Sequence, residues 1–151
     1  MRILAVDPGE KRIGIALSDP SGTIANPLTV LKHVSRAIDA ATIAQLALER
    51  EAERIIVGQA LDDENQPTPQ SRRAYRLAAA IRSQTRIPVE LWDESGSTQA
   101  AQAARIAMGV SRRKRSGHMD DIAATYILQT FLDALDEPAK SRPDPTSLEE
   151  A

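Results

Sequence analysis

MRILAVDPGEKRIGIALSDP, residues 1–20, contains two apolar segments separated by a short turn. The first, residues 3–6, is apolar without alternation, which is typical of a strand buried on both faces. Residues 8–11 (PGEK) have turn composition, and the chain resumes at residues 12–17 as a second strand. The pattern therefore predicts a β-hairpin that leaves Asp7 at the end of a central strand.

Length and composition set limits on the class of protein. The 151 residues fit one domain, and the absence of cysteine excludes disulfide and thiolate chemistry. The sequence shows no signal peptide and no apolar run long enough to span a bilayer, so we expect a cytoplasmic protein without a membrane partner. The net charge of -2 gives no general attraction to nucleic acid, and an aromatic content of 3% argues against a base-stacking surface.

The next stretch predicts an edge strand and a crossover helix. Residues 23–28 (TIANPL) suit a strand at the sheet edge, because proline is tolerated there and not in a sheet centre. A helix is expected over residues 35–53, with Ser35 as its N-cap. Its apolar positions recur at helical spacing: Ile38, Ala41, Leu46 and Ala47.

The middle of the chain alternates strand and helix. A short buried strand is expected at residues 55–58, a surface loop at 59–70, a helix at 71–85 and a strand at 88–92. The apolar stripe expected on that helix contains Tyr75, Leu77, Ala78 and Ile81. The alternation predicts an α/β fold, a mixed five-stranded sheet in spatial order 3-2-1-4-5 with helices on both faces.

Acidic residues recur where these elements end or begin. Asp93 and Glu94 end the fifth strand, and Ser97 or Thr98 is suited to cap a helix running to Met108. Asp120 begins the last helix, in line with an apolar stripe of Ala123, Ala124, Ile127 and Phe131. With Asp7, these acids are expected at one end of the sheet. Each is also suited to a structural role in a turn or a helix start.

Carboxylates that converge without histidine or cysteine favour hard cations such as Mg²⁺ or Mn²⁺. Two such ions can activate water and stabilise a leaving oxygen, so the pattern predicts phosphodiester hydrolysis. The first and fifth strands would lie roughly 10 Å apart, which the long Glu94 side chain or a second ion could bridge. Asp62 or Asp63, in the loop expected at residues 59–70, is the alternative metal ligand.

Basic residues form a second pattern. Arg112, Arg113, Lys114 and Arg115 directly precede the last helix, and shorter pairs occur at Lys11-Arg12 and Arg72-Arg73. We expect the run at 112–115 to contact nucleic acid, although such a run is also compatible with a solvated loop. From residue 137 onward, prolines and acids predict a disordered tail, so the domain is expected to span residues 1–136.

Four groups of residues together resemble a known family. They are Asp7-Pro8-Gly9 with residues 12–16 (RIGIA) and Ser18-Asp19; Ile56-Val57-Gly58 with Leu61; Asp93-Glu94 with Thr98; and Asp120 followed by Ala123-Ala124 and residues 127–129 (ILQ). In this combination the chain, up to about Asp136, resembles the YqgF (RuvX) family of RNase H-like proteins. That family contains Holliday junction resolvase-like nucleases and nucleases that mature the 5′ end of pre-16S ribosomal RNA.

The resemblance implies a catalytic, metal-binding triad of Asp7, Glu94 and Asp120, with Asp93 as an additional acid. It also implies Mg²⁺ or Mn²⁺ as cofactor and branched DNA or pre-rRNA as substrate. The chain departs from the family pattern at Ala60, where proline is usual, and at Ser95 and Ser97, where arginine and threonine are usual. Loss of the arginine removes a bidentate phosphate ligand. Lys11, Arg12 or the run at 112–115 is expected to supply that charge.

Two other functions remain open on the sequence. A nucleic-acid-binding or ribosome-associated module could keep the fold without cutting, and the Ser95 departure favours that alternative. An actin-like ATPase also opens on a strand ending in Asp-x-Gly, but it binds nucleotide between two domains of this fold and the chain has the length of one. Resolution of a four-way junction would favour a twofold homodimer, whereas trimming an RNA end requires only a monomer.

Overall fold

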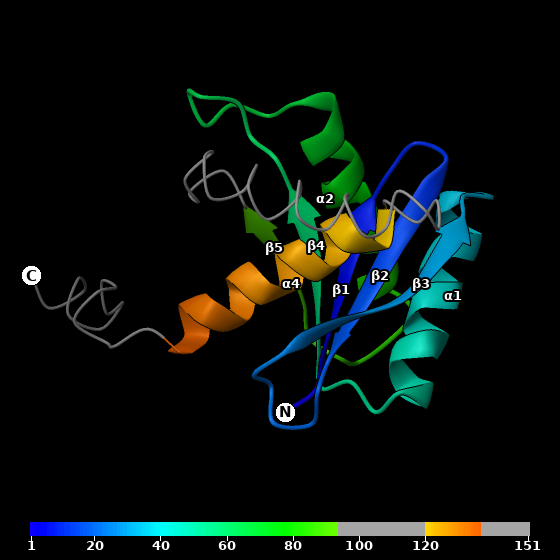
Figure 1. Cartoon of the computed structure of the whole chain (residues 1–151). Helices are drawn as coiled ribbons and strands as arrows, with labels where there is room; N and C mark the ends of the chain where they lie inside the picture. The colour runs from blue at the N-terminus through cyan, green and yellow to red at the C-terminus, as the bar shows by residue number, and fades with distance from the viewer. Residues whose placement is uncertain (94–119, 137–151) are drawn as a thin grey trace, which may run out of the picture.

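The computed structural model describes residues 1–93 and 120–136 (Figure 1). Its strands are β1 (Ile3–Pro8), β2 (Arg12–Ser18), β3 (Ala25–Lys32), β4 (Arg54–Gln59) and β5 (Val89–Asp93). Its helices are α1 (Arg36–Glu49), α2 (Pro69–Arg82) and α4 (Asp120–Asp136). Of these helices, none is long and apolar enough to cross a bilayer.

The strands form one mixed sheet in the order β3-β2-β1-β4-β5, as the sequence predicted. The first three strands form the antiparallel meander, and β4 and β5 are parallel to β1. Pro27 lies in the edge strand β3, beside a register shift between Ile15 and Ala16 of β2. The central position of β1 therefore follows from its unbroken apolar sequence, which only a strand covered on both faces can bury.

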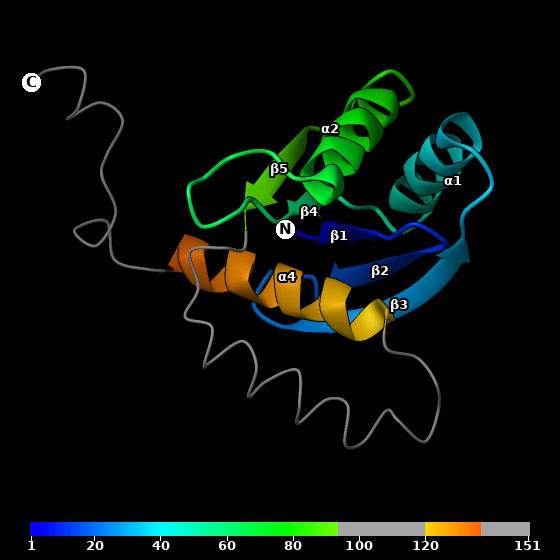
Figure 2. The same ribbon diagram turned by 90° about the horizontal axis from the view of Figure 1, so that it is seen from above.

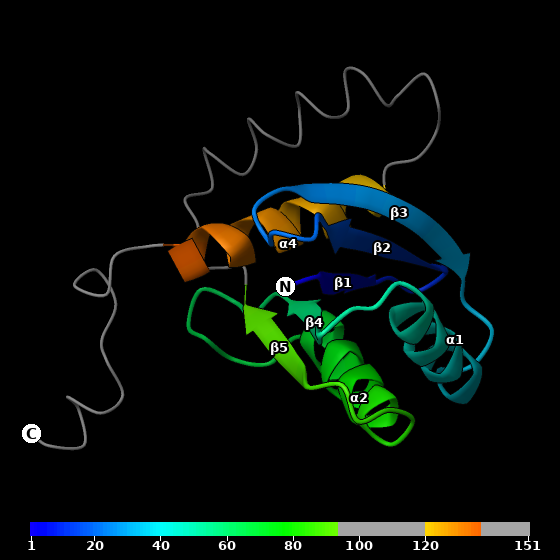
Figure 3. The ribbon, with the colours of Figure 1, turned by 90° about the horizontal axis from the view of Figure 1, so that it is seen from below.

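Helices cover both faces of the sheet, with α1 and α2 on one side and α4 on the other (Figures 2 and 3). Side chains of β1 alternate between two cores. Leu4 and Val6 belong to the core beneath α1 and α2, whereas Ile3 and Ala5 belong to the core beneath α4. Residues two apart in a strand face the same side of the sheet, so the core to which one of them belongs shows the direction of the other.

The buried faces of α1 and α2 differ from those expected. In α1, Ile38 is 51% exposed and Ala41 is also exposed, and the apolar residues that are buried are Ala40, Ile43, Ala44 and Ala47. The helix is apolar around much of its circumference, so spacing alone does not select the face that meets the sheet. Tyr75 of α2 is 61% exposed, because Ala74, Leu77, Ala78 and Ile81 form its buried face.

Several boundaries also differ from the expected ranges. β3 extends to Lys32, and α2 starts at Pro69 after the N-cap Thr68, whose side chain and that of Ser71 form a capping box. α1 ends at Glu49, shortly before Glu51 adopts a positive φ of 59°. These are local capping and turn effects that leave the order of the elements unchanged.

Helix α4 packs mainly on β2, β3 and β1, and it also makes close contacts with single residues of β4 and β5. A Cβ atom on Gly58 would lie 2.5 Å from Cδ1 of Ile127, so a larger residue would force the Ile127 side chain to shift. Trp92 packs edge-on against Phe131, with ring centroids 5.1 Å apart, and its Nε1 donates to Oγ1 of Thr130 at 3.0 Å. Trp92 is half-buried and packs against the core beneath α4.

Candidate active site

Asp7 lies near the end of β1, where it pairs with Gly14 of β2 and is half-buried. It follows Ile3 and Ala5 in the alternation along the strand and so belongs to the face covered by α4. The next turn is tight, because the Gly9 N–H donates to the Arg12 carbonyl at 3.0 Å and a Cβ on Gly9 would lie 2.3 Å from that oxygen. The turn ends β1 just beyond the Asp7 carboxylate.

Asp93 is the last residue of β5 and lies opposite Gln59 of β4. Val89 and Leu91 pack into the core beneath α1 and α2, whereas Trp92 packs against α4. Alternation therefore assigns Asp93 to the α1/α2 face and Asp7 to the α4 face. The two acids also lie two strands apart, so the structure does not bring them together. Glu94 lies outside the described residues.

Helix α4 begins at Asp120, and its first turns lie toward the same end of the sheet as the turn between β1 and β2 (Figures 1 and 2). Seven residues further on, Ile127 contacts Gly58, the residue that follows Val57 opposite Val6. Asp120 is therefore about 10 Å along the helix axis from that contact. The backbone places its start near the carboxyl end of β1, and its side chain lies outside the described part of the chain.

Within residues 1–93 and 120–136, no group of three or more histidine, cysteine or acidic side chains is arranged to hold a metal ion. Of the predicted triad, Asp7 is the residue whose side chain is described, and its half-buried carboxylate is a suitable oxygen ligand for Mg²⁺ or Mn²⁺. The side chain of the alternative ligand Asp62 forms hydrogen bonds within its own loop. Its Oδ1 accepts the Glu64 and Gln66 N–H groups at 2.9 and 2.8 Å.

The basic residues divide between described and undescribed parts of the chain. Lys11 and Arg12 are exposed at the turn that follows β1, close in sequence to Asp7. Arg112, Arg113, Lys114 and Arg115 lie outside the described residues, as do the departures at Ser95 and Ser97. The described part of the predicted nucleic-acid contact is therefore the turn between β1 and β2.

The departure at Ala60 has a structural explanation. The Ala60 N–H donates to Oε1 of Gln70 at 2.7 Å, and the Gln70 amide also donates to the Gly58 carbonyl at 3.3 Å. Proline has no N–H and could not make the first bond. Gln70 thus joins the first turn of α2 to the end of β4.

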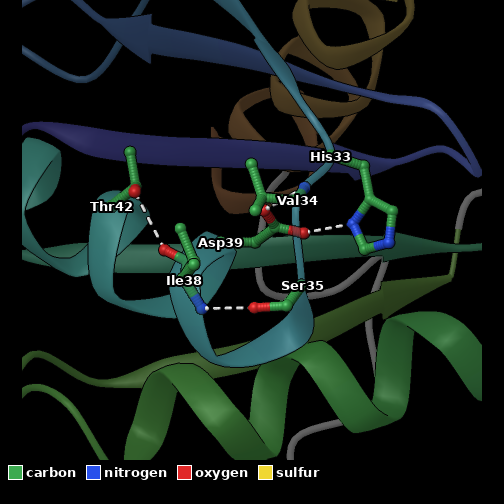
Figure 4. Close-up of polar contacts among 6 residues, drawn as sticks. All are labelled: His33, Val34, Ser35, Ile38, Asp39 and Thr42. Atoms are coloured by element: carbon green, nitrogen blue, oxygen red, sulfur yellow. Dashed lines mark hydrogen bonds and ion pairs between the residues drawn. The ribbon is translucent and has the colours of Figure 1, made fainter.

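A polar pair of one exposed and one buried side chain was not predicted from the sequence. His33 Nδ1 lies 2.5 Å from Oδ2 of Asp39, and the Val34 N–H donates to the other carboxylate oxygen at 3.1 Å (Figure 4). Asp39 is only 4% exposed, in the first turn of α1 after the N-cap Ser35. The sequence signal was an acid in the first helical turn, which ordinarily indicates no more than a favourable dipole interaction.

Comparison with known proteins places these observations in a family. The family model described as "RuvX: Holliday junction resolvase" matches residues 1–134. A relative from Syntrophomonas wolfei named "Putative pre-16S rRNA nuclease" is 36% identical over 133 residues, covering 88% of this chain and 94% of its own length. A relative of the same name from Acidiphilium cryptum is 40% identical over 137 residues, covering 91% of this chain and 87% of its own length.

Solved structures agree on the fold. Thermus thermophilus RuvC in complex with a Holliday junction substrate matches 90% of this chain and 96% of its own with a TM-score of 0.58 at 15% identity. The fowlpox virus Holliday junction resolvase matches 89% of this chain and 99% of its own with a TM-score of 0.53 at 18% identity. The fold is therefore the RNase H-like fold of the resolvases. With the family model matched along nearly the whole domain, the chain belongs to the RuvX (YqgF) family.

Proposed function

We propose that this chain is a metal-dependent endonuclease that hydrolyses phosphodiester bonds in structured nucleic acid. The observation on which the proposal rests is the position of Asp7, half-buried at the end of the central strand on the face covered by α4. Membership of the RuvX family and relatives named as pre-16S rRNA nucleases support the same activity.

In this proposal Asp7, Glu94 and Asp120 are the metal ligands and catalytic acids. Asp93 is an additional acid at the end of β5, on the face of the sheet opposite Asp7. The oxygen ligands of the three catalytic acids suit Mg²⁺ or Mn²⁺, which when bound would activate water and neutralise charge on the leaving oxygen. The contribution of the chain itself is to hold the acids at one end of a rigid sheet. The tight turn at Gly9 and the contact of α4 with Gly58 limit how far that end can shift.

The proposed substrates are branched DNA of the Holliday junction type and the 5′ end of pre-16S ribosomal RNA. The first is what a similar fold binds in the RuvC complex. For the second, the relatives' names specify pre-16S rRNA, and the 5′ end is part of our proposal. Lys11, Arg12, Arg112, Arg113, Lys114 and Arg115 are proposed to position the phosphates. We place the activity in the cytoplasm, in a domain of residues 1–136 with a tail of residues 137–151.

The test compares Asp7→Asn with Asp136→Asn, the same substitution at the exposed end of α4. Cleavage of a four-way DNA junction and of a pre-16S fragment is measured with Mg²⁺ and with Mn²⁺, alongside binding and thermal unfolding. Asp7→Asn is expected to lower the cleavage rate more than about 100-fold. Loss of a residue that only hydrogen-bonds a metal ligand typically lowers activity by roughly 10 to 100-fold, and loss of the ligand itself should cost more. Asp136→Asn should cleave normally.

Two results would contradict the proposal. Undiminished cleavage by Asp7→Asn would show that the acidic site is wrongly assigned. Binding without cleavage by the folded wild-type protein, with either metal and either substrate, would favour the non-cleaving nucleic-acid-binding module.

For junction cleavage we further propose a twofold homodimer, because two opposed cuts across a symmetric junction require two sites. The solution mass at micromolar concentration and the pattern of nicks test this together. A dimer that makes paired, symmetric nicks is expected. A monomer that cuts only the RNA precursor would remove the resolvase activity and leave the nuclease proposal intact.

A further inference from the structure

A pocket of about 230 Å³ lies on the α1/α2 side of the sheet, across the turn from Asp7. Its walls come from the turn after β1, from the chain entering α1, and from α2, including Gly9, His33, Arg36 and Arg73. Pockets that hold drug-sized ligands usually measure roughly 300–1,000 Å³. This pocket therefore suits a single chemical group better than a whole nucleotide.

Arg73 gives the pocket its chemical preference. Within the described part of the chain, its Nε is buried and has no hydrogen-bond partner. Its Nη1 lies 3.6 Å from Oε1 of Glu10, but the Glu10 side chain is 80% exposed, so solvent screens this contact and a ligand can displace it. A buried guanidinium donor without an acceptor is unfavourable unless something binds it.

The buried acid in the pocket does not meet that need. Asp39 is engaged by His33 and by the Val34 N–H, and its side chain is 5% exposed. Arg36, by contrast, is exposed at the first position of α1 and lines the same pocket. The donors still available come from Arg36 and Arg73, which favours an anionic ligand. Guanidinium groups bind phosphate through paired hydrogen bonds.

We propose that this pocket binds a backbone phosphate of the nucleic-acid substrate. This phosphate is next, along the same nucleic-acid strand, to the phosphate that is held near Asp7. This inference rests on the proposed function, since it concerns the same substrate. Pro8, the last residue of β1, and Gly9, in the turn that follows, both line the pocket and come directly after Asp7. A nucleic-acid strand that crosses this turn would meet both Asp7 and the pocket. Arg72 and Arg76, exposed beside Arg73 on α2, continue the positive surface beyond the pocket.

The first test compares Arg73→Gln with Arg86→Gln, which removes the same charge from the exposed loop after α2, away from the pocket. Binding of a fluorescent single-stranded RNA and of a four-way DNA junction is measured by anisotropy over a range of salt, without divalent metal. Arg73→Gln is expected to weaken binding of both and to reduce the slope of log affinity against log salt by about one. Arg73→Lys, which keeps the charge, should keep most of that slope.

Stability separates a binding role from a structural one. A structural arginine would be needed for folding, whereas Arg73 leaves a buried donor unpaired. Arg73→Gln is therefore expected to unfold at the same or a higher temperature than the wild-type protein while binding more weakly. Lower stability together with unchanged binding would overturn the proposal.

A direct measurement follows the Nε–H resonance of Arg73 by NMR, assigned by its loss in Arg73→Gln. The resonance should shift on addition of the RNA strand at concentrations where inorganic phosphate has no effect. A shift at lower concentrations of inorganic phosphate would make this a site for the free anion and overturn the assignment to a strand. Normal cleavage and unchanged binding in Arg73→Gln would overturn the pocket proposal and leave the nuclease proposal standing. Failure of the wild-type protein to bind or cut would overturn both.

Discussion

Asp93 and Glu94 are adjacent acids, and only one of them is expected to bind metal. Alternation assigns Asp93 to the face opposite Asp7, and the next residue along an extended strand would face the other way. We therefore expect Glu94→Gln to lose metal-dependent cleavage and Asp93→Asn to retain it. Cleavage rates with Mg²⁺ and Mn²⁺, measured on the variants side by side, check this. An inactive Asp93→Asn with an active Glu94→Gln would exchange the two roles.

Asp19 stabilises the turn between β2 and β3. Its carboxylate accepts the Ile24 N–H at 2.9 Å, the Ser21 hydroxyl and the Thr23 N–H at 2.8 Å in the turn between β2 and β3. These hydrogen bonds, that from Ile24 first, hold the pKa of Asp19 well below its usual range.

A lowered pKa makes the contribution of Asp19 to stability depend on pH. In the unfolded chain the group takes up a proton near pH 3.9, whereas in the folded protein it remains ionised to lower pH. Its contribution is therefore complete above about pH 5 and is lost as pH falls through the lowered pKa. Asp19→Asn should unfold at a lower temperature than wild type at pH 7, with a smaller difference at about pH 2 to 3. A difference that is constant with pH would contradict this account.

At the scale of elements, the contact between Gly58 and Ile127 is the closest approach of α4 to β4, although most of the packing of the helix is on β2, β3 and β1. Gly58→Ala would place a methyl group 2.5 Å from Cδ1 of Ile127, so we expect a loss of about 1–3 kcal/mol in the free energy of unfolding. Ile127→Val removes that carbon and alone should cost about 0.5–1.5 kcal/mol. In the double variant the two losses should not add, because the smaller valine makes room for the added methyl group.

Urea unfolding of the two single variants and the double variant measures this coupling. Additive losses would mean that the helix shifts to accept the added methyl group. Because α4 begins at Asp120, such a shift would also be expected to slow cleavage.

At the scale of the whole molecule, the net charge of -2 means that nucleic-acid binding must depend on local positive charge. Replacing Arg112, Arg113, Lys114 and Arg115 together by glutamine should weaken binding to all nucleic acids. Its salt dependence should fall by about one unit for each phosphate that the chain no longer neutralises. Sequence preference should not change, because phosphate contacts position the ligand without reading bases. Filter binding at several salt concentrations tests this, and an unchanged slope would assign the run to a solvated loop.

The sequence by itself determined the order of the elements, the mixed sheet and the place of Asp7 at the end of its central strand. These features depend on local signals that act over a few residues. An unbroken apolar run has to be covered on both faces, the glycine shortly after Asp7 favours a turn, and Pro27 is tolerated only at a sheet edge. The positions of Asp7, Asp93 and Asp120 could be predicted for the same reason, since the first two lie at or near strand ends and the third begins α4.

The tertiary structure alone decided which face of α1 is buried, that Tyr75 is exposed, and that Asp93 lies on the face opposite Asp7. It also decided that His33 pairs with Asp39 and that Arg73 reaches a pocket beside the turn after β1. Apart from the pairing of His33 with Asp39, which are six residues apart, these outcomes depend on contacts between residues far apart in the chain. A helix that is apolar around most of its surface, or a charged residue on a helix, takes its role from whichever neighbours the packing of the sheet and helices brings to it.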